Sequence, residues 1–346
     1  MDYLILSKDT VVAKWENDYF TVLNDALLPL YLKNTQNVRK WLETRAIDCH
    51  RAHSRLLKKA LRLTEKDDLS TVLAANAATI TDNYWVKPID SDLTYSDVRF
   101  DNDYFSSLAL TGSYDSFNRA ANQKSPKTPE LTNTGSFEKC WKLHDGKWQM
   151  YKKANHEEMF SEIFIYKLGL MLNFNMAEYE RGKGIVKTND FTDNASVNFE
   201  NAYSFMGDNE DYIDTVNALK GLCPAAIGDY VKMIFLDTIC ANPDRHTFNF
   251  GLLRDADNGE ILGLAPNFDN NMALISRGYP DKRKKRDKEL LVKLFNELTE
   301  YDNSLKAYIP DLSAETVKSA VKAVGMRVRT DDIVKFIMSG YDAIIK

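Results

Sequence analysis

The sequence predicts an α+β protein, and three of its features indicate this class. Apolar residues between positions 137 and 189 follow the order strand, strand, helix, strand. From Pro224 onwards, most apolar residues recur at spacings of three and four, which is typical of helices. Hydrophobic residues make up 44% of the 346 residues, which is enough to bury a sizeable core and excludes disorder over the whole chain.

The N-terminal region combines a strand pair with helices. Alternating apolar residues predict strands over 3–7 and 10–15. Residues 88–135 are rich in Asp, Ser, Asn and Thr, and within them 123–129 are expected to form an exposed linker. Helical spacing of apolar residues predicts three helices, over 38–46, 51–63 and 69–78.

The following stretch predicts a hairpin, a helix and a further strand. Asp145-Gly146 is a strong signal for a two-residue hairpin turn, and the return strand ends at Lys152 and Lys153. The next expected elements are a helix over 157–172 and a strand over 185–189.

A polar loop interrupts the C-terminal region. Pro224 suits the first turn of a helix that is expected to run to about Ala241, and Pro243 ends it. A hairpin follows, because Asn258-Gly259 is a turn signal between two apolar stretches. The hairpin strands are expected over 250–253 and 260–264, and further helices over 289–298, 314–324 and 330–344.

Charge and cysteine content exclude several classes of protein. The 45 basic and 50 acidic residues give a formal net charge of −5, which excludes a generally basic nucleic-acid binder. The four cysteines form no CxxC pair, so neither a structural zinc site nor a disulfide framework is predicted. A signal peptide and a run of about 18 apolar residues are both missing, so we expect a cytoplasmic location without membrane association. The densest positive run, residues 282–286, is interpreted as a solvated helix start or as a docking site for an acidic peptide or nucleic acid.

Between Gly135 and Asp269 the chain holds, in order, the groups that phosphoryl transfer from a nucleotide requires. These are a glycine loop over the phosphates, a lysine on their oxygens, an acid that orients the lysine, a carboxylate near the acceptor and oxygen ligands for magnesium. Asn249 follows Asp244 by five residues, so one loop can supply both a base and a neutral metal ligand. The hairpin then delivers Asp269, whose charge suits the sparse carboxylate ligation that magnesium prefers.

Several segments resemble one family. Asn242–Gly251 resembles the catalytic loop of the HipA-like kinases, which are bacterial relatives of the protein-kinase and phosphatidylinositol-kinase fold. Asn267-Phe268-Asp269 is similar to their metal-binding aspartate segment, Gly135–Lys139 to their phosphate-binding loop and Ser161-Glu162 to their lysine-pairing helix. The resemblance covers about residues 130–340. It implies a bilobal protein-kinase-like fold, with a mainly β N-lobe carrying helical additions, an α-helical C-lobe and the nucleotide between them.

The resemblance also implies a domain organisation and roles for individual residues. The domains are 1–130, packed on the N-lobe, then the N-lobe core over 131–189 and the C-lobe over 190–346. Asp244 is the general base or orients the acceptor, whereas His246 orients Asp244 or Asn249 by a hydrogen bond or packs as a polar spacer. Asn249 and Asp269 are magnesium ligands. The implied ATP-binding residues are Gly135, Ser136, Phe137, Lys152, Glu162, Val186 and Thr188.

Two of these roles have open alternatives. Strand alternation from Met150 favours Lys152 over Lys153 for the phosphates. Glu162 is preferred over Glu158 for the ion pair with that lysine, although one helical turn separates them. Some family members autophosphorylate in the glycine loop, so the candidate sites of self-modification are Thr132, Thr134 and Ser136.

We therefore expect ATP- and magnesium-dependent phosphorylation of a protein serine or threonine, with autophosphorylation. The implied partners are a protein substrate and an antitoxin-like regulator, with nucleic acid bound only through a partner. Two alternatives stay open: the same fold acting on a small molecule or lipid, and a non-catalytic toxin-like or regulatory binding protein. A protein kept only for binding could have lost Asp244, Asn249 or Asp269, and this sequence retains all three.

Overall fold

Each of the two units into which the chain divides is built from segments that are distant in sequence. The structure, a computed structural model, describes residues 2–63, 67–113, 127–280 and 285–345, without the side chains of 285–287. Unit 1 comprises Met1–Lys153, Lys187–Glu200 and Leu253–Glu260, and unit 2 comprises Ala154–Val186, Asn201–Leu252 and Ile261–Lys346. The division into 1–130, 131–189 and 190–346 stays a prediction.

Unit 1 contains a four-stranded antiparallel sheet. Tyr3, on one of the two inner strands, pairs with Trp15 of the neighbouring strand on one side and with Pro88 of the strand on the other side. Neighbouring residues of β1 and of β2, such as Ile5 with Leu6 and Val12 with Ala13, are buried together, so both faces of these strands are covered. The predicted strand pair over 3–7 and 10–15 is confirmed. In the order β3-β2-β1-β4, the strands are β1 (Tyr3–Ser7), β2 (Thr10–Glu16), β3 (Tyr19–Val22) and β4 (Tyr84–Pro88).

Short helices follow this sheet in unit 1. The three predicted helices are present but shorter than predicted, and two of them begin at a side-chain cap. Asn37 accepts a hydrogen bond from the backbone N–H of Lys40, and Asp67 accepts one from Ser70. The helices are α1 (Leu30–Thr35), α2 (Val38–Glu43), α3 (Ser54–Ala60), α4 (Asp68–Leu73), α5 (Tyr95–Val98), α6 (Ser106–Thr111) and the 3₁₀ helix η1 (Pro129–Thr132).

The predicted linker over 123–129 is wrong at its C-terminal end. Thr128 and Pro129 are buried, because η1 begins there. Thr128 accepts a hydrogen bond from the backbone N–H of Glu130, and Pro129 takes the first helical position. Residues 123–126 lie outside the described residues, as do the side chains of 282–286 in the predicted basic run.

The hairpin of β5 (Lys139–His144) and β6 (Lys147–Lys153) matches the prediction. Its turn residues Asp145 and Gly146 both have positive φ, at 50° and 77°, as a tight hairpin turn requires. The strands pair antiparallel from Lys139 opposite Lys152 to His144 opposite Lys147. Trp141 and Trp148 carry the hairpin into the core of unit 1, where they join Leu57 of α3, Trp85 of β4 and Leu108 of α6.

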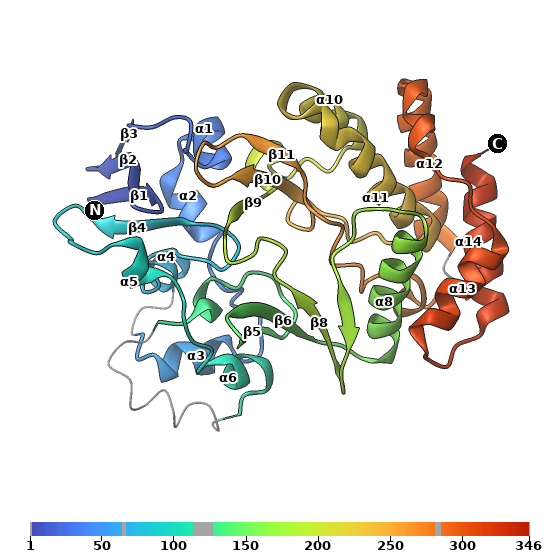
Figure 1. Cartoon of the computed structure of the whole chain (residues 1–346), viewed down its shortest axis with the longest axis horizontal. Helices are drawn as coiled ribbons and strands as arrows, with labels where there is room; N and C mark the ends of the chain where they lie inside the picture. Colours follow the sequence, from blue (N-terminus) through green and yellow to red (C-terminus); the bar gives the residue numbers. More distant parts are fainter. Residues whose placement is uncertain (1, 64–66, 114–126, 281–284, 346) are drawn as a thin grey trace. The chain divides into compact units, whose positions relative to one another are not determined.

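Unit 2 is mainly helical, and its helices surround α11 (Figure 1). This helix is buried along nearly its whole length and contacts α8, α10, α12 and α14. The predicted helices over 314–324 and 330–344 have the predicted bounds. The helices are α8 (His156–Met171), α9 (Tyr203–Met206), α10 (Tyr212–Leu222), α11 (Ile227–Cys240), α12 (Lys285–Tyr301), α13 (Ala314–Val324) and α14 (Thr330–Ile344), with 3₁₀ turns η2 (Pro224–Ala226), η3 (Leu274–Arg277) and η5 (Asn303–Tyr308).

Five strands complete the described chain. The predicted strand at 185–189 and the predicted hairpin around Asn258-Gly259 are present. Among the described helices, none has both the length and the apolar character needed to cross a bilayer. The strands are β7 (Tyr179–Arg181), β8 (Ile185–Asn189), β9 (Val197–Asn201), β10 (Gly251–Asp255) and β11 (Ile261–Leu264).

Candidate active site

The loop that follows α11 folds back on itself and brings Asp244 and Asn249 together. Ala241 ends the helix in a left-handed conformation, with φ of 51°. Asn242, which is fully buried, accepts a hydrogen bond from the backbone N–H of Asp244 at 3.2 Å. The side-chain amide of Asn249 donates to the carbonyl oxygen of Asp244 at 2.9 Å. Because this bond fixes the amide nitrogen of Asn249, its oxygen points the other way and suits a metal ligand.

Arg245 joins this loop to the segment that contains Asp269. Its guanidinium is buried and donates to the carbonyl oxygens of Asn249 and Phe268, each at 2.7 Å. It also donates to the side-chain oxygens of Asn267 at 3.0 Å and Asn270 at 2.7 Å. One side chain therefore sets the spacing between the two segments that carry the predicted magnesium ligands.

Arg245 is itself held by a buried carboxylate on α11. Asp237 accepts hydrogen bonds from Nε and Nη2 of Arg245, at 2.8 and 3.0 Å, and a further one from the amide of Asn242. Both oxygens of this carboxylate are therefore used, and its residue is fully buried. A paired, bidentate arrangement of this kind compensates both buried groups for the hydration that they lose.

Asp269 stands in a strained backbone conformation next to two buried groups. Its φ is 60°, which is uncommon for a residue other than glycine. The backbone N–H of Asp269 donates to the hydroxyl of Tyr179 at 3.1 Å, and the N–H of Asn270 donates to the carboxylate of Glu162 at 2.7 Å. Burial first, and then the charges of Glu162 and Asp269, raise the pKa of Tyr179 well above its usual value, so this hydroxyl stays neutral.

The electrostatics of these residues suit a divalent cation. Burial lowers the pKa of Arg245, but the charges of Asp237, Asp269 and Glu162 outweigh burial, and the net shift is upward. Three carboxylates thus act on one guanidinium. The oxygens of Asp269 and Asn249 are hard donors of the kind that magnesium prefers, so the residues present fit this metal.

His246 contacts Asp244 and Asn249 through its backbone and Phe248 through its ring. Its N–H donates to the carbonyl oxygen of Asp244 at 3.0 Å, and its carbonyl oxygen accepts from the N–H of Asn249 at 2.8 Å. Its Nδ1 accepts a hydrogen bond from the backbone N–H of Phe248 at 3.3 Å, and the two rings meet edge to face. Among the described residues, the ring makes no hydrogen bond to Asp244 or Asn249. His246 therefore packs through its ring and hydrogen-bonds Asp244 and Asn249 through its backbone, and its role stays a prediction.

The predicted phosphate-binding lysine and glycine loop, Lys152 and Gly135–Lys139, lie in unit 1. Lys152 is buried and its ammonium lies 4.8 Å from the centre of the Phe137 ring, whereas Lys153 is exposed. Gly135 has a φ of 94°, a backbone conformation that favours glycine, and the ammonium of Lys139 lies 2.6 Å from where a Cβ would stand. These contacts favour Lys152 over Lys153, and they add Lys139 to the residues that lie against the glycine.

The remaining predicted residues differ in exposure. Glu158 belongs to a capping box at the start of α8, where Asn155 and Glu158 each accept a hydrogen bond from the other's backbone N–H. Glu162, in contrast to Glu158, is fully buried. Val186 is buried on β8 and Thr188 is half-buried. Among the candidates for self-modification, Thr134 and Ser136 are exposed, whereas Thr132 is buried and donates to the carbonyl oxygen of Ala78 at 2.6 Å.

Sequence reasoning missed the residues that organise the site. No individual role was predicted for Arg245, Asn270, Asp237, Tyr179 or Asn267. A signal existed for Asp237, since it is a lone acid in the apolar stretch Phe235–Ile239 of a predicted helix. The others act through contacts between segments that are distant in sequence.

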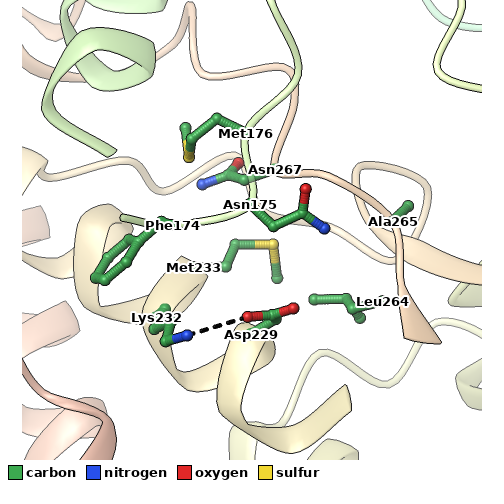
Figure 2. A pocket seen from close by; sticks show the side chains of 9 residues that line it. All are labelled: Phe174, Asn175, Met176, Asp229, Lys232, Met233, Leu264, Ala265 and Asn267. Carbon is green, nitrogen blue, oxygen red and sulfur yellow. Dashed lines mark hydrogen bonds and ion pairs between the residues drawn. The ribbon is translucent and has the colours of Figure 1, made fainter. Parts of the chain in front are cut away.

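A small pocket in unit 2 has no role in this site. Figure 2 shows Asp229 and Lys232 of α11 as an ion pair at its edge, with Asn267 among the lining residues. Its cavity volume is about 10 Å³, which is room for about one water molecule. A nucleotide therefore cannot be assigned to it.

A second feature is a group of possible metal ligands in unit 1. Within the described part of the chain, Asp48, Cys49 and His50 are the one set of three His, Cys, Asp or Glu residues with ligand atoms close together. The nitrogen of His50 lies 2.9 Å from the Asp48 carboxylate and 3.7 Å from the Cys49 sulfur. Cys49 and His50 are exposed neighbours in sequence, so their proximity needs no metal to explain it.

Comparisons of this chain with known proteins show a similarity of fold to two solved structures. A scan against protein-family models finds no match, and neither does a search of curated proteins. Among solved structures, the chain resembles HipA of Shewanella oneidensis MR-1, from its toxin–antitoxin complex with HipB and operator DNA, at 11% identity over 99% of each chain with a TM-score of 0.56. It also resembles the Helicobacter pylori proinflammatory kinase CtkA at 15% identity, over 60% of this chain and 91% of that chain, with a TM-score of 0.45.

Proposed function

We propose that this chain, which has the α+β kinase fold of HipA, transfers the γ-phosphoryl group of ATP to a serine or threonine of a protein. The observation that carries the proposal is the contact of Arg245 with both Asn249 and Phe268. Through it, the loop with Asp244 and the segment with Asp269 keep a fixed spacing within unit 2. Phosphoryl transfer depends on such positioning, because it leaves the protein little covalent chemistry to perform.

Magnesium would be held by the carboxylate of Asp269 and the amide oxygen of Asn249. When bound, the metal neutralises charge on the transferring phosphoryl group. The donor atoms support this assignment, since magnesium prefers hard oxygen ligands such as a carboxylate and an amide oxygen. Tyr179 and Glu162 would keep Asp269 and Asn270 in place through hydrogen bonds to their backbone N–H groups.

Asp244 would accept the proton of the acceptor hydroxyl or orient that hydroxyl. Its backbone is fixed on both sides, by Asn242 and by the amide of Asn249. His246 would shape the loop by packing on Phe248. Lys152 would bind the phosphate oxygens, and its ion pair with Glu162 stays a prediction.

The acceptor and the regulator rest on resemblance rather than on contacts. The solved HipA was captured with HipB and operator DNA. We propose an antitoxin-like protein partner for this chain, with any nucleic acid bound through that partner. Exposed Thr134 and Ser136 are the preferred sites of self-modification, because buried Thr132 would have to leave its helix to reach a nucleotide.

Acceptor screening with labelled ATP tests the proposal. The purified full chain is incubated with magnesium and γ-labelled ATP alone, with a mixture of bacterial proteins, and with a panel of small molecules and lipids. We expect label on the chain itself, mapped to Thr134 or Ser136, and on serine or threonine of added protein. Label on a small molecule or lipid alone would support phosphoryl transfer but contradict a protein acceptor. The absence of any transfer would contradict the assignment as an enzyme.

A further inference from the structure

The ends of the proposed phosphate segment are held by Arg51, a buried residue that lies far from it in sequence. The segment, residues 133–141, contains Gly135, Ser136 and Phe137. Arg51 is 2% exposed and donates to the carbonyl oxygen of Asn133 at 2.8 Å and to the carbonyl oxygen of Lys139. One guanidinium therefore fixes the backbone on both sides of the glycine.

Glu130 fixes the same segment from the other side. It is 1% exposed, and its two oxygens accept hydrogen bonds from different ends of the segment. One accepts from the side-chain amide of Asn133 at 3.0 Å, and the other from the backbone N–H of Trp141 at 2.7 Å. Asn133 is thus bound twice, through its carbonyl oxygen by Arg51 and through its amide by Glu130.

A third contact adds to these two. The carboxylate of Glu138 accepts a hydrogen bond from the backbone N–H of Ala52 at 2.6 Å, next to Arg51 in the chain. Residues 51 and 52 consequently hold the segment at Asn133, Glu138 and Lys139. The exposed stretch from Thr134 to Ser136 lies between these anchored positions.

The energetic cost of these groups argues for a specific role. A buried guanidinium and a buried carboxyl group lose their hydration, and hydrogen bonds must compensate for it. The side chains of Arg51 and Glu130 make their described hydrogen bonds to residues of segment 133–141 rather than to each other. Apolar residues of similar size would fill the same volume at lower cost, but they could not hold a backbone.

We infer that Arg51 and Glu130 are positioning residues that hold the phosphate segment in the conformation that binds the nucleotide. They give the region before residue 131 a part in nucleotide binding. The inference rests on the proposed function. It does not depend on the identity of the acceptor.

Hydrogen exchange of the full chain, read at peptides over 133–141, tests the clamp without using activity. Arg51→Lys keeps the charge but lacks the fork that reaches two carbonyl oxygens. Glu130→Gln replaces one acceptor oxygen by an amide that opposes an N–H donor. The matched controls are Arg254→Lys and Glu200→Gln, since this buried pair of unit 1 holds Ala26, Leu28 and Leu30 instead.

We expect faster exchange over 133–141 in both clamp variants and unchanged exchange there in both controls. The dissociation constant for ATP with magnesium, measured by calorimetry, should rise at least about tenfold in the clamp variants only. In kinetics, the KM for ATP should rise while kcat at saturating ATP changes far less, which a general loss of folded protein would not produce.

Other results of these experiments would contradict the clamp, its role in nucleotide binding or the proposed function. Unchanged exchange over 133–141 in Arg51→Lys and Glu130→Gln overturns the clamp, even if the wild-type chain binds ATP. Faster exchange with an unchanged dissociation constant for ATP overturns its role in nucleotide binding. A wild-type chain that binds no ATP overturns the proposed function and this inference with it.

Discussion

At the scale of single residues, the candidate site depends most on Arg245. Its donors reach Asp237 on α11, two carbonyl oxygens and two side-chain amides. These charge-assisted hydrogen bonds connect the loop to α11 and to the segment with Asp269, so Arg245 holds more than its own turn. It explains how a loop without regular secondary structure keeps Asp244, Asn249 and Asp269 in a constant arrangement.

Replacing Arg245 by lysine should therefore destabilise unit 2. A single ammonium cannot donate along the five directions of the guanidinium, so Asp237 and the facing amides lose partners while they stay buried. We expect a loss of about 3 kcal/mol in the free energy of unfolding, measured with urea. Arg181→Lys, at an exposed arginine of the same unit that donates to the carbonyl oxygen of Gly325, is the control. A loss within about 0.5 kcal/mol of this control would show that Arg245 is not the organising residue.

At this scale, contacts between residues close in sequence could be predicted, whereas contacts between distant residues could not. Asp244 and Asn249 could be proposed because they share one loop, and the structure joins them by a hydrogen bond. The partners of Arg245 lie up to 25 residues away, and no local pattern encodes such contacts. The roles of Asn267 and Tyr179 could not be foreseen for the same reason.

At the scale of elements, turns and helices with strong local sequence signals could be predicted. The turn at Asp145-Gly146 and the helices over 314–324 and 330–344 appear where patterns predicted them. Strands without such signals were missed. β3 (Tyr19–Val22) is largely exposed and β7 (Tyr179–Arg181) has three residues, so neither shows an alternation long enough to detect.

The 3₁₀ helix η1 carries a group whose protonation should affect stability. Burial, with a smaller contribution from the charge of Asp103, raises the pKa of Glu130 to about 7, against the lowering effects of Arg51, Asn133 and Trp141. The unfolded chain loses this proton near pH 4.5, the usual value, whereas the folded chain keeps it until about pH 7. The folded state thus binds one more proton between these values, and its stability falls as the pH rises through that range.

Unfolding with urea at pH 5 and pH 8 measures this effect. Relative to Glu130→Gln, which cannot titrate, the wild-type chain should lose up to about 3 kcal/mol of stability between the two pH values. Glu289→Gln, at an exposed acid on α12, should show no comparable difference. A stability difference between wild type and Glu130→Gln that stays constant from pH 5 to pH 8 would contradict the assignment.

At the scale of the whole molecule, the proposed roles divide between the two units. Unit 1 holds the phosphate segment and Lys152, and unit 2 holds the loop with Asp244 and the segment with Asp269. The fold class could be predicted from the order of strands and helices together with the resemblance of a few short segments. The units could not, because each is assembled from three stretches of chain that only tertiary contacts bring together.

The central claim is that Asp244 and Asp269 serve magnesium-dependent phosphoryl transfer. The most direct measurement is the rate of γ-phosphoryl transfer from labelled ATP by the wild type, Asp244→Asn, Asp269→Asn and the control Asp229→Asn. Asp229 is also half-buried in unit 2, where it pairs with Lys232. We predict magnesium-dependent transfer by the wild type and the control, and a rate at least about a hundredfold lower in the other two, with all four chains folded. Wild-type rates in Asp244→Asn and Asp269→Asn would contradict the account.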